Sequence, residues 1–354
     1  MQRGGVTLVL PIALSRDLFA TLLSHGQGTS DGGLRSVALR GLAQMIKRRD
    51  KAGKYEGRIY INVGHTGLDR PGHGEWVRRS GVRAVYFLHD LIPLTHPEYC
   101  RPGEPEKHVR RISTVMERGS GIIANSADTV SSLESFVRAG QSGRIPSTVI
   151  APLGAELSAG ANEVQAVEAS LPSAPYFLML GTIEGRKNHL LMLNIWADMA
   201  RALGEACPKL VIIGKRGWEC EQAVDLLERC EAIRGKVIEL PRCNDVQLDR
   251  YMRGARALVF PSFVEGYGLP LVEALYCGTP VIASNLGVFR ELAGDVPDYF
   301  SPIDGLGWKE AILSYAATQS PARDAQLARM KAWVAPTWSA HFAKVDAWLD
   351  QLRD

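Results

Sequence analysis

One short segment brings together two glycines and the start of a helix. Residues 257–284 read as an apolar stretch, a glycine-bearing loop, a helical stretch opened by Pro270 and a second apolar stretch. Gly266 and Gly268 allow backbone N–H groups to approach a ligand closely, because neither residue carries a Cβ. The helix that follows directs the positive end of its dipole at the same loop. The segment therefore predicts a phosphate site.

Two carboxylates flank this loop. Glu265 precedes it and Glu273 lies on the helix beyond it, with seven residues between them. Both can accept hydrogen bonds from sugar and ribose hydroxyls at the loop. A structural interpretation stays open, in which Glu273 favours the helix dipole and Glu265 is a solvated loop acid.

Two cations follow another predicted strand. Arg186 and Lys187 come after the apolar run Tyr176–Leu180 and precede a helical pattern. Arg can grip a diphosphate with two N–H groups, and Lys attracts it as a point charge. The sequence predicts a diphosphate site here, with exposed surface bases as the alternative.

Three further polar residues stand at predicted strand ends. Lys215 and Arg242 are candidates to border the base and the phosphates, and His89 is expected to face a cleft. An exposed loop cation is the alternative for Lys215, and a structural histidine is the alternative for His89.

The motifs as a group resemble a known family. Glu-Gly-Tyr-Gly-Leu-Pro at 265–270, Glu273 and Gly-Thr-Pro-Val-Ile-Ala-Ser at 278–284 resemble the signature of glycosyltransferase family 4, the retaining enzymes of GT-B fold. Gly-Thr-Ile-Glu-Gly-Arg-Lys-Asn-His at 181–189 resembles the family's diphosphate loop. Gly-Lys-Arg-Gly-Trp at 214–218 is similar to a loop of its mannosyltransferase-like members. These motifs cover about residues 176–293.

The resemblance implies roles for particular residues. The implied catalytic residues are His89, Arg186, Lys187 and Glu265. The implied donor-binding residues are Gly33, Thr182, Lys215, Arg242, Glu265, Gly266, Tyr267, Gly268, Leu269 and Glu273. Many family members have Arg at the position of Thr182, so Arg186 is expected to supply the second cation.

The resemblance also implies a reaction. The expected chemistry is same-face substitution, in which the leaving diphosphate helps to deprotonate the acceptor hydroxyl and the protein supplies position and charge. GDP-mannose is the favoured donor, and a glycan or lipid-linked acceptor in surface polysaccharide synthesis (lipopolysaccharide or exopolysaccharide) is expected. No Asp-x-Asp motif stands at a predicted strand end, so no metal and no further cofactor are expected.

The sequence also bears on three other functions. A non-catalytic sugar-nucleotide-binding relative stays open. An NAD-dependent oxidoreductase needs Gly-x-Gly-x-x-Gly after a first strand, and neither half of the sequence has it there. A nucleic-acid-binding role lacks aromatic residues interleaved with the basic ones.

Alternating apolar runs and amphipathic stretches must position these residues. This alternation predicts an α/β fold with two doubly wound, Rossmann-like parallel sheets facing a cleft. Strands are predicted at 6–12, 58–63, 83–88, 121–125, 148–151, 176–180, 209–213, 236–240, 257–260 and 280–284. Helices are predicted at 34–48, 106–118, 127–139, 189–203, 220–233, 246–253, 270–277 and 288–293.

Length and composition bound the architecture. The 354 residues, 46% hydrophobic and 22% charged, suit two domains of ordinary size. We predict an N-terminal acceptor domain at 1–155 and a donor domain at 156–334, with a C-terminal helix at about 335–354 packing back on the first. The six cysteines form no Cys-x-x-Cys pair, so reduced thiols in a cytoplasmic protein are expected.

Charge is unevenly distributed. Residues 1–155 carry 21 Lys and Arg against 13 Asp and Glu, a net +8, and the remainder carries 20 against 25, a net −5. Many of the basic residues lie on the predicted helices at 34–48 and 106–118, the second of which includes His108, Arg110 and Arg111. An anionic inner membrane surface is a predicted partner of this half, with a peripheral location, and a solvated basic face is the alternative. Residues 18–31 are predicted to form an acceptor lid.

Overall fold

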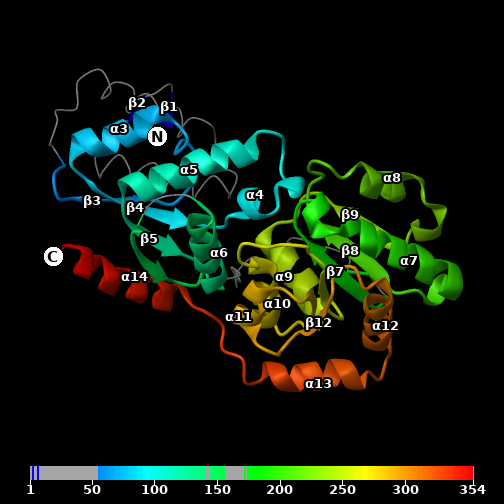
Figure 1. The fold of residues 1–354 in the computed structure, drawn as a ribbon. Helices are drawn as coiled ribbons and strands as arrows, with labels where there is room; N and C mark the ends of the chain where they lie inside the picture. The colour runs from blue at the N-terminus through cyan, green and yellow to red at the C-terminus, as the bar shows by residue number, and fades with distance from the viewer. Residues whose placement is uncertain are drawn as a thin grey trace, which may run out of the picture.

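The chain folds into two lobes, each built on a parallel sheet (Figure 1). The computed structural model describes residues 55–140, 144–155, 171–172 and 174–353, together with the backbone of an antiparallel pair, β1 (Gln2–Arg3) and β2 (Val6–Thr7). The predicted helix at 34–48, the glycine loop with Gly33 and the predicted lid at 18–31 lie outside the described residues.

The first sheet has the strand order β3-β4-β5-β6, and all its strands are parallel. Its strands are β3 (Ile59–Asn62), β4 (Arg83–Leu88), β5 (Gly119–Ala124) and β6 (Ser147–Ile150). The central strands β4 and β5 are largely buried, because a parallel sheet is covered on both faces. Three helices cover one face: α3 (Pro71–Ser80), α5 (Glu104–Arg118) and α6 (Ala127–Arg138).

A helix from far along the chain covers the other face of this sheet. α14 (Trp338–Arg353) packs Val345, Trp348 and Leu349 against Val85, Phe87 and Ile123 of β4 and β5. The Trp348 indole N–H also donates to Ser147 Oγ at 3.0 Å. Figure 1 shows α14 beside β5, at the end of a connection that crosses back from the second lobe.

The second sheet has the order β12-β11-β10-β7-β8-β9. Its strands are β7 (Tyr176–Leu180), β8 (Lys209–Ile213), β9 (Val237–Leu240), β10 (Leu258–Phe260), β11 (Val281–Ser284) and β12 (Asp298–Phe300). One face carries α9 (Asp245–Gly254), α10 (Leu269–Tyr276) and α11 (Gly287–Ala293). The other carries α7 (His189–Leu203), α8 (Glu221–Arg229) and α12 (Gly305–Ala316).

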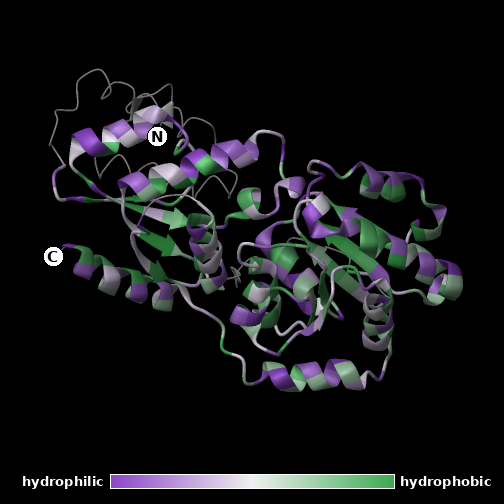
Figure 2. Cartoon of the chain, in the orientation of Figure 1, coloured by the Kyte–Doolittle hydropathy of each residue, from purple (hydrophilic) through white to green (hydrophobic). Residues whose placement is uncertain are grey.

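The distribution of apolar residues explains these layers. Figure 2 shows apolar residues concentrated in the strands of both sheets, while α3 and α5 are largely hydrophilic on the outside. Burying such strands removes apolar surface from water, which is the main favourable term in folding. In the part of the chain that the structure describes, no helix combines the length and apolar character needed to cross a membrane.

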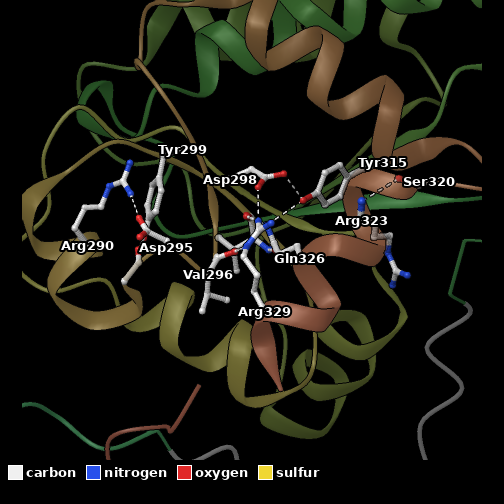
Figure 3. A network of polar contacts seen from close by, with 12 residues as sticks. Arg290, Asp295, Val296, Asp298, Tyr299, Tyr315, Ser320, Arg323, Gln326 and Arg329 are labelled. Atoms are coloured by element: carbon white, nitrogen blue, oxygen red, sulfur yellow. Dashed lines mark hydrogen bonds and ion pairs between the residues drawn. The ribbon is translucent and has the colours of Figure 1, made fainter. Parts of the chain in front are cut away.

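A polar network fixes α13 (Pro321–Met330) to the second sheet (Figure 3). The buried Gln326 side chain pairs with the backbone N–H and carbonyl of Val281, and it also donates to the Tyr315 hydroxyl at 2.9 Å. Tyr315 in turn donates to Asp298 at 2.6 Å, and Arg329 pairs with the same carboxylate. Gln326 thus satisfies backbone groups of Val281 that β12 does not pair, since β12 pairs with β11 from Ile282 onward.

Most predicted elements are present, and several were missed. β4, β7, β8 and α7 have the predicted bounds. The predicted helix at 220–233 was wrong as one element, because Cys230 is extended and separates α8 from a short 3-10 helix, Glu231–Ile233. The helices and strands that were missed include α3, α4 (Ile92–Thr95), α12, α13 and β12.

The basic face predicted for α5 was partly wrong. His108 is only 1% exposed and Arg111 pairs with Glu104 at 3.2 Å, so only part of the expected cationic surface remains on this helix. Arg110 is exposed. The predicted domain boundary at 155–156 stays a prediction.

Candidate functional site

The candidate site lies where the strand order of the second sheet reverses. From β7 the chain proceeds outward through β8 and β9, then returns to place β10 on the other side of β7. The loops that leave β7 and β10 therefore meet at the carboxyl edge of the sheet, where doubly wound folds bind ligands. These loops are residues 181–187 and 261–268.

Glu265 joins the two predicted cations. Lys187 Nζ lies 2.5 Å from Glu265 Oε1, and Arg186 Nη1 lies 2.8 Å from Oε2. Ser262 Oγ donates to Oε1 at 2.7 Å. A second carboxylate, Glu184, places Oε1 2.7 Å from Arg186 Nε. Glu184, Lys187 and Glu265 are each less than a tenth exposed, so this is a buried ion cluster.

The backbone of the two loops is joined around this cluster. A short 3-10 helix, η3 (Gly185–Lys187), ends at Asn188, which adopts the left-handed conformation at φ 59°. Asn tolerates this region better than most residues, and its side chain donates to Pro261 O at 3.2 Å. The Phe263 N–H donates to Arg186 O at 2.8 Å. These bonds fix the positions of both cations.

Burial and mutual attraction compete within the cluster. Burial raises the pKa of Glu265, but the charges of Lys187 and Arg186 outweigh it, so the pKa lies below its ordinary value. Burial lowers the pKa of Arg186, but Glu265 and then Glu184 raise it to a net value above the ordinary one. Burial raises the pKa of Glu184, and Arg186 offsets only part of that rise.

This arrangement differs from the one expected for Glu265. The sequence predicted that its carboxylate would accept from sugar and ribose hydroxyls, and the structure directs it at the cations instead. Both cations retain N–H groups that make no hydrogen bond to the described residues. Arg186 Nη2 makes no hydrogen bond to any other described residue, and Lys187 Nζ bonds to Glu265 alone among them. The free N–H groups can therefore donate to the oxygens of an anion.

Gly266 is where the two lobes meet. A Cβ on this residue would lie 2.7 Å from Asp90 Cβ and 2.9 Å from His89 O. Thr129 Oγ1 donates to Gly266 O at 3.4 Å from the first lobe. The sequence predicted that this glycine allows a ligand to approach the backbone closely. In the structure, it permits close approach of the loop after β4.

His89 has a defined hydrogen-bonding state. Its Nε2 lies 2.8 Å from the Val63 carbonyl, and a carbonyl only accepts, so Nε2 carries the proton. Nδ1 is then an acceptor when the ring is neutral. The neighbouring His65 accepts the His89 backbone N–H at 3.4 Å, and burial lowers the His65 pKa to about 3. His89 therefore follows β4 as predicted, with one ring nitrogen available.

The rest of the glycine loop is structural in several respects. The buried Tyr267 donates its hydroxyl to Leu153 O at 2.7 Å, and burial raises its pKa. Gly268 has φ 114° and is the N-cap residue directly before α10, and a Cβ there would meet the Phe289 ring. Leu269 is partly exposed at the first position of α10.

Glu273 and Glu265 belong to different surroundings. Glu273 is half-buried on α10, and its pKa is raised by burial and by the charge of Asp245, with no contribution from Glu265. The two carboxylates make no contact with each other in the described residues, and the prediction that both serve one loop mouth stays a prediction.

The remaining predicted donor residues lie on neighbouring loops. Thr182 is half-buried, and its methyl group lies 2.6 Å from the point where a Cβ on Gly217 would stand. Lys215 is exposed, and its carbonyl accepts the Ile183 N–H at 2.9 Å. Arg242 is exposed in the loop after β9. Gly33 lies outside the described residues.

A second contact between the lobes was not foreseen. The carboxylate of Glu291, on α11, accepts from the backbone N–H groups of Ala127 at 2.7 Å and Asp128 at 3.1 Å. These are the first residues of α6, so the negative charge lies at the positive end of a helix dipole. Figure 1 shows α6 and α11 at the junction of the lobes.

Glu184, Ser262, His65 and Glu291 are the polar residues that sequence reasoning missed. Glu184 stood within the motif at 181–189, and its position two residues before Arg186 was the available signal. The other three act across the fold, on partners that no spacing in the sequence indicates.

Comparison with known proteins agrees with this geometry. Residues 162–297 match the family model described as Glycosyl transferases group 1, so the chain carries a domain of this kind. It is 30% identical over 235 residues to the serotype-specific mannosyltransferase WbdA of Escherichia coli, covering 64% of this chain and 29% of that protein. It is 31% identical over 231 residues to O-antigen chain mannosyltransferase B of Escherichia coli, covering 63% of this chain and 58% of that protein.

Solved structures define the fold. Sucrose-phosphate synthase from Thermosynechococcus elongatus superposes with a TM-score of 0.63 at 17% identity, covering 97% of this chain and 80% of that chain. TarM gives a TM-score of 0.59 at 11% identity, covering 85% and 56%. These neighbours have the GT-B fold, so the predicted fold class is confirmed.

Proposed function

We propose that this chain is a retaining glycosyltransferase that moves a hexose from a nucleoside-diphosphate sugar to a glycan or lipid-linked acceptor. The observation that carries the proposal is the position of Arg186 and Lys187. Both lie where the strand order of the second sheet reverses, within the segment that matches the group 1 family model. Both also keep N–H groups that make no hydrogen bond to the described residues. A diphosphate is the ligand whose charge and geometry suit that pair.

The proposed reaction breaks the bond between the anomeric carbon and the diphosphate oxygen. The acceptor oxygen bonds to that carbon on the same face, and its proton passes to the leaving phosphate oxygen. Arg186 and Lys187 stabilise the charge that develops on the leaving group, and they are already oriented before it forms. Glu265 keeps both cations in place, and it shares them with the phosphate oxygens when the donor is bound.

The first lobe would supply the acceptor side. His89 stands at the end of β4 beside Gly266, and its Nδ1 is free to accept a hydroxyl from the sugar or the acceptor. The closeness of the two lobes at this point would exclude water from the reacting atoms, which strengthens charge interactions there.

GDP-mannose is the proposed donor, and surface polysaccharide synthesis is the proposed setting. Two Escherichia coli relatives named as mannosyltransferases, one of them for the O-antigen chain, support this choice. Reaction without a metal ion and contact of the basic first lobe with an anionic membrane surface belong to the same proposal. Added EDTA should then leave transfer unchanged.

A donor panel tests the proposed function. Thermal unfolding is followed with GDP-mannose, UDP-glucose, UDP-galactose and ADP-glucose, and consumption of each is followed with a lipid-linked glycan acceptor. Donor present at 100 times its Kd should stabilise the fold by about 2.7 kcal/mol. A shift with GDP-mannose together with mannosyl transfer supports the proposal. Binding without transfer across acceptors would favour a non-catalytic sugar-nucleotide-binding protein, and no shift with any donor would reject both.

A further inference from the structure

Arg186 is held from two sides. Glu265 Oε2 approaches Nη1 at 2.8 Å, and Glu184 Oε1 approaches Nε at 2.7 Å. Nη1 also donates to Val264 O at 3.2 Å. Two of the three guanidinium nitrogens are therefore occupied, and Nη2 is the nitrogen without a hydrogen bond among the described residues. The orientation of the planar group is set by these contacts.

Burial of the Glu184 carboxylate is energetically unfavourable. Its side chain is 4% exposed, and isolated buried carboxylates are strongly unfavourable. Within the described residues, Arg186 is its ion-pair partner. Its backbone carbonyl also accepts the Lys187 N–H at 3.1 Å, so one backbone turn carries both residues. A buried acid with this one contact has its effect through the orientation of Arg186.

The residue at position 182 explains why the orientation of Arg186 matters. The side chain that follows Gly181 is Thr182, whose methyl group lies against Gly217, so no cation projects from the end of β7 itself. The cations that serve this strand end are Lys187, whose side chain lies beside Gly181, and Arg186, four residues after Thr182. A long arginine side chain loses rotamer entropy when it is fixed by a ligand, and a carboxylate that already holds it reduces that loss at the moment of binding.

We propose that Glu184 is a positioning residue for diphosphate binding, which holds Arg186 so that its Nη2 edge faces the donor. This inference rests on the proposed function, because it assumes that Arg186 contacts the diphosphate. Glu184 itself touches no substrate.

A double-mutant cycle tests the inference. Affinities for GDP and for inorganic pyrophosphate are measured by calorimetry for the wild type, Glu184→Ala, Arg186→Ala and the double variant. Glu184→Ala should weaken both ligands about tenfold, the size of one charge-assisted hydrogen bond. The double variant should bind no more weakly than Arg186→Ala alone, because Glu184 has no effect without its partner.

Conservative and control variants separate position from stability. Glu184→Gln keeps an acceptor oxygen near Nε, so it should recover most of the affinity. If Glu184→Ala does not fold, Glu184→Asp carries the test, because its shorter side chain withdraws the carboxylate from Arg186 Nε and should weaken both ligands. Glu205→Ala removes an ion-pair carboxylate at the opposite edge of the same sheet, where Glu205 Oε2 lies 2.9 Å from Lys236 Nζ. Its affinities should equal those of the wild type.

The outcomes are distinguishable. Wild-type affinity in folded Glu184→Ala, or losses that multiply in the double variant, would overturn the positioning role alone. If Arg186→Ala binds GDP as tightly as the wild type does, the diphosphate site of the proposed function is wrong, and this inference is wrong with it.

Discussion

Lys187 Nζ and Glu265 Oε1 lie 2.5 Å apart, on loops that leave two neighbouring strands of the second sheet. The two residues are 78 positions apart in sequence, and both are less than a tenth exposed. Burial lowers the pKa of Lys187 below its ordinary value, and Glu265 offsets part of that fall. The pairing also orients the Lys187 side chain, which makes it a preformed site for a leaving diphosphate.

Replacing Lys187 by Ala should abolish transfer and leave the fold intact. The charge on the leaving group would lose one of its two cations, and removal of such a donor commonly costs 10²–10³-fold in kcat, about 3–4 kcal/mol. Steady-state transfer and circular dichroism measure the two effects. Lys209→Ala, at the opposite edge of the sheet, is the control and should keep wild-type turnover. Near-normal turnover in Lys187→Ala would reject the diphosphate assignment.

Replacing Glu265 by Gln should destabilise the protein most at neutral pH. Loss of the carboxylate leaves Lys187 without an ion-pair partner among the described residues and leaves Arg186 with Glu184 alone, in a buried site, which costs about 3–5 kcal/mol. The pKa of Glu265 is lower in the fold than its ordinary 4.5, so its contribution is present above pH 4.5 and is lost as the pH falls through the folded value. Urea unfolding at pH 7 and pH 4 should show the difference from wild type shrinking in acid. A pH-independent difference would contradict the prediction.

Replacing Glu291 by Ala should open the two lobes. The variant loses both hydrogen bonds to the start of α6, and because Glu291 is exposed the expected effect is modest, about 1 kcal/mol or a fivefold shift toward open forms. Small-angle scattering should report a larger radius of gyration than for the wild type. Glu310→Ala, an exposed glutamate on α12, should leave the radius unchanged.

Replacing Gln326 by Leu should lower the free energy of unfolding by about 2–3 kcal/mol. The backbone N–H and carbonyl of Val281 would remain buried without the partners that Gln326 supplies. Chemical unfolding of the variant measures this loss, with Gln222→Leu on the exposed surface of α8 as the control. A Gln326→Leu midpoint equal to that of the wild type would show that the network in Figure 3 contributes little.

Local patterns predicted much of the fold and the position of two candidate site residues at a strand end. The apolar run Tyr176–Leu180 and the helical pattern after it placed Arg186 and Lys187 at a strand end, because strand and helix periodicity is encoded locally. The helix α3 was not predicted, because Gly72 and Gly74 weaken its helical pattern.

Contacts between residues that are distant along the chain could not be predicted from the sequence. The direction of the Glu265 side chain depends on which strands are neighbours in the sheet, and the tight fit of Gly266 against Asp90 depends on how the two lobes meet. Neither follows from residue type or spacing. Motif spacing predicted which residues form the site, and three-dimensional packing determined what each one touches.

The position of α14 has a consequence for biosynthesis. Trp348 reaches Ser147, 201 residues earlier in the chain, and its ring fills the space above Gly121. While a ribosome is still making the second lobe, the apolar side chains of β4 and β5 that face α14 have no cover. The first lobe cannot complete this part of its core until α14 has been made, so we expect that a chaperone that shields the uncovered sheet during translation raises the yield of native protein.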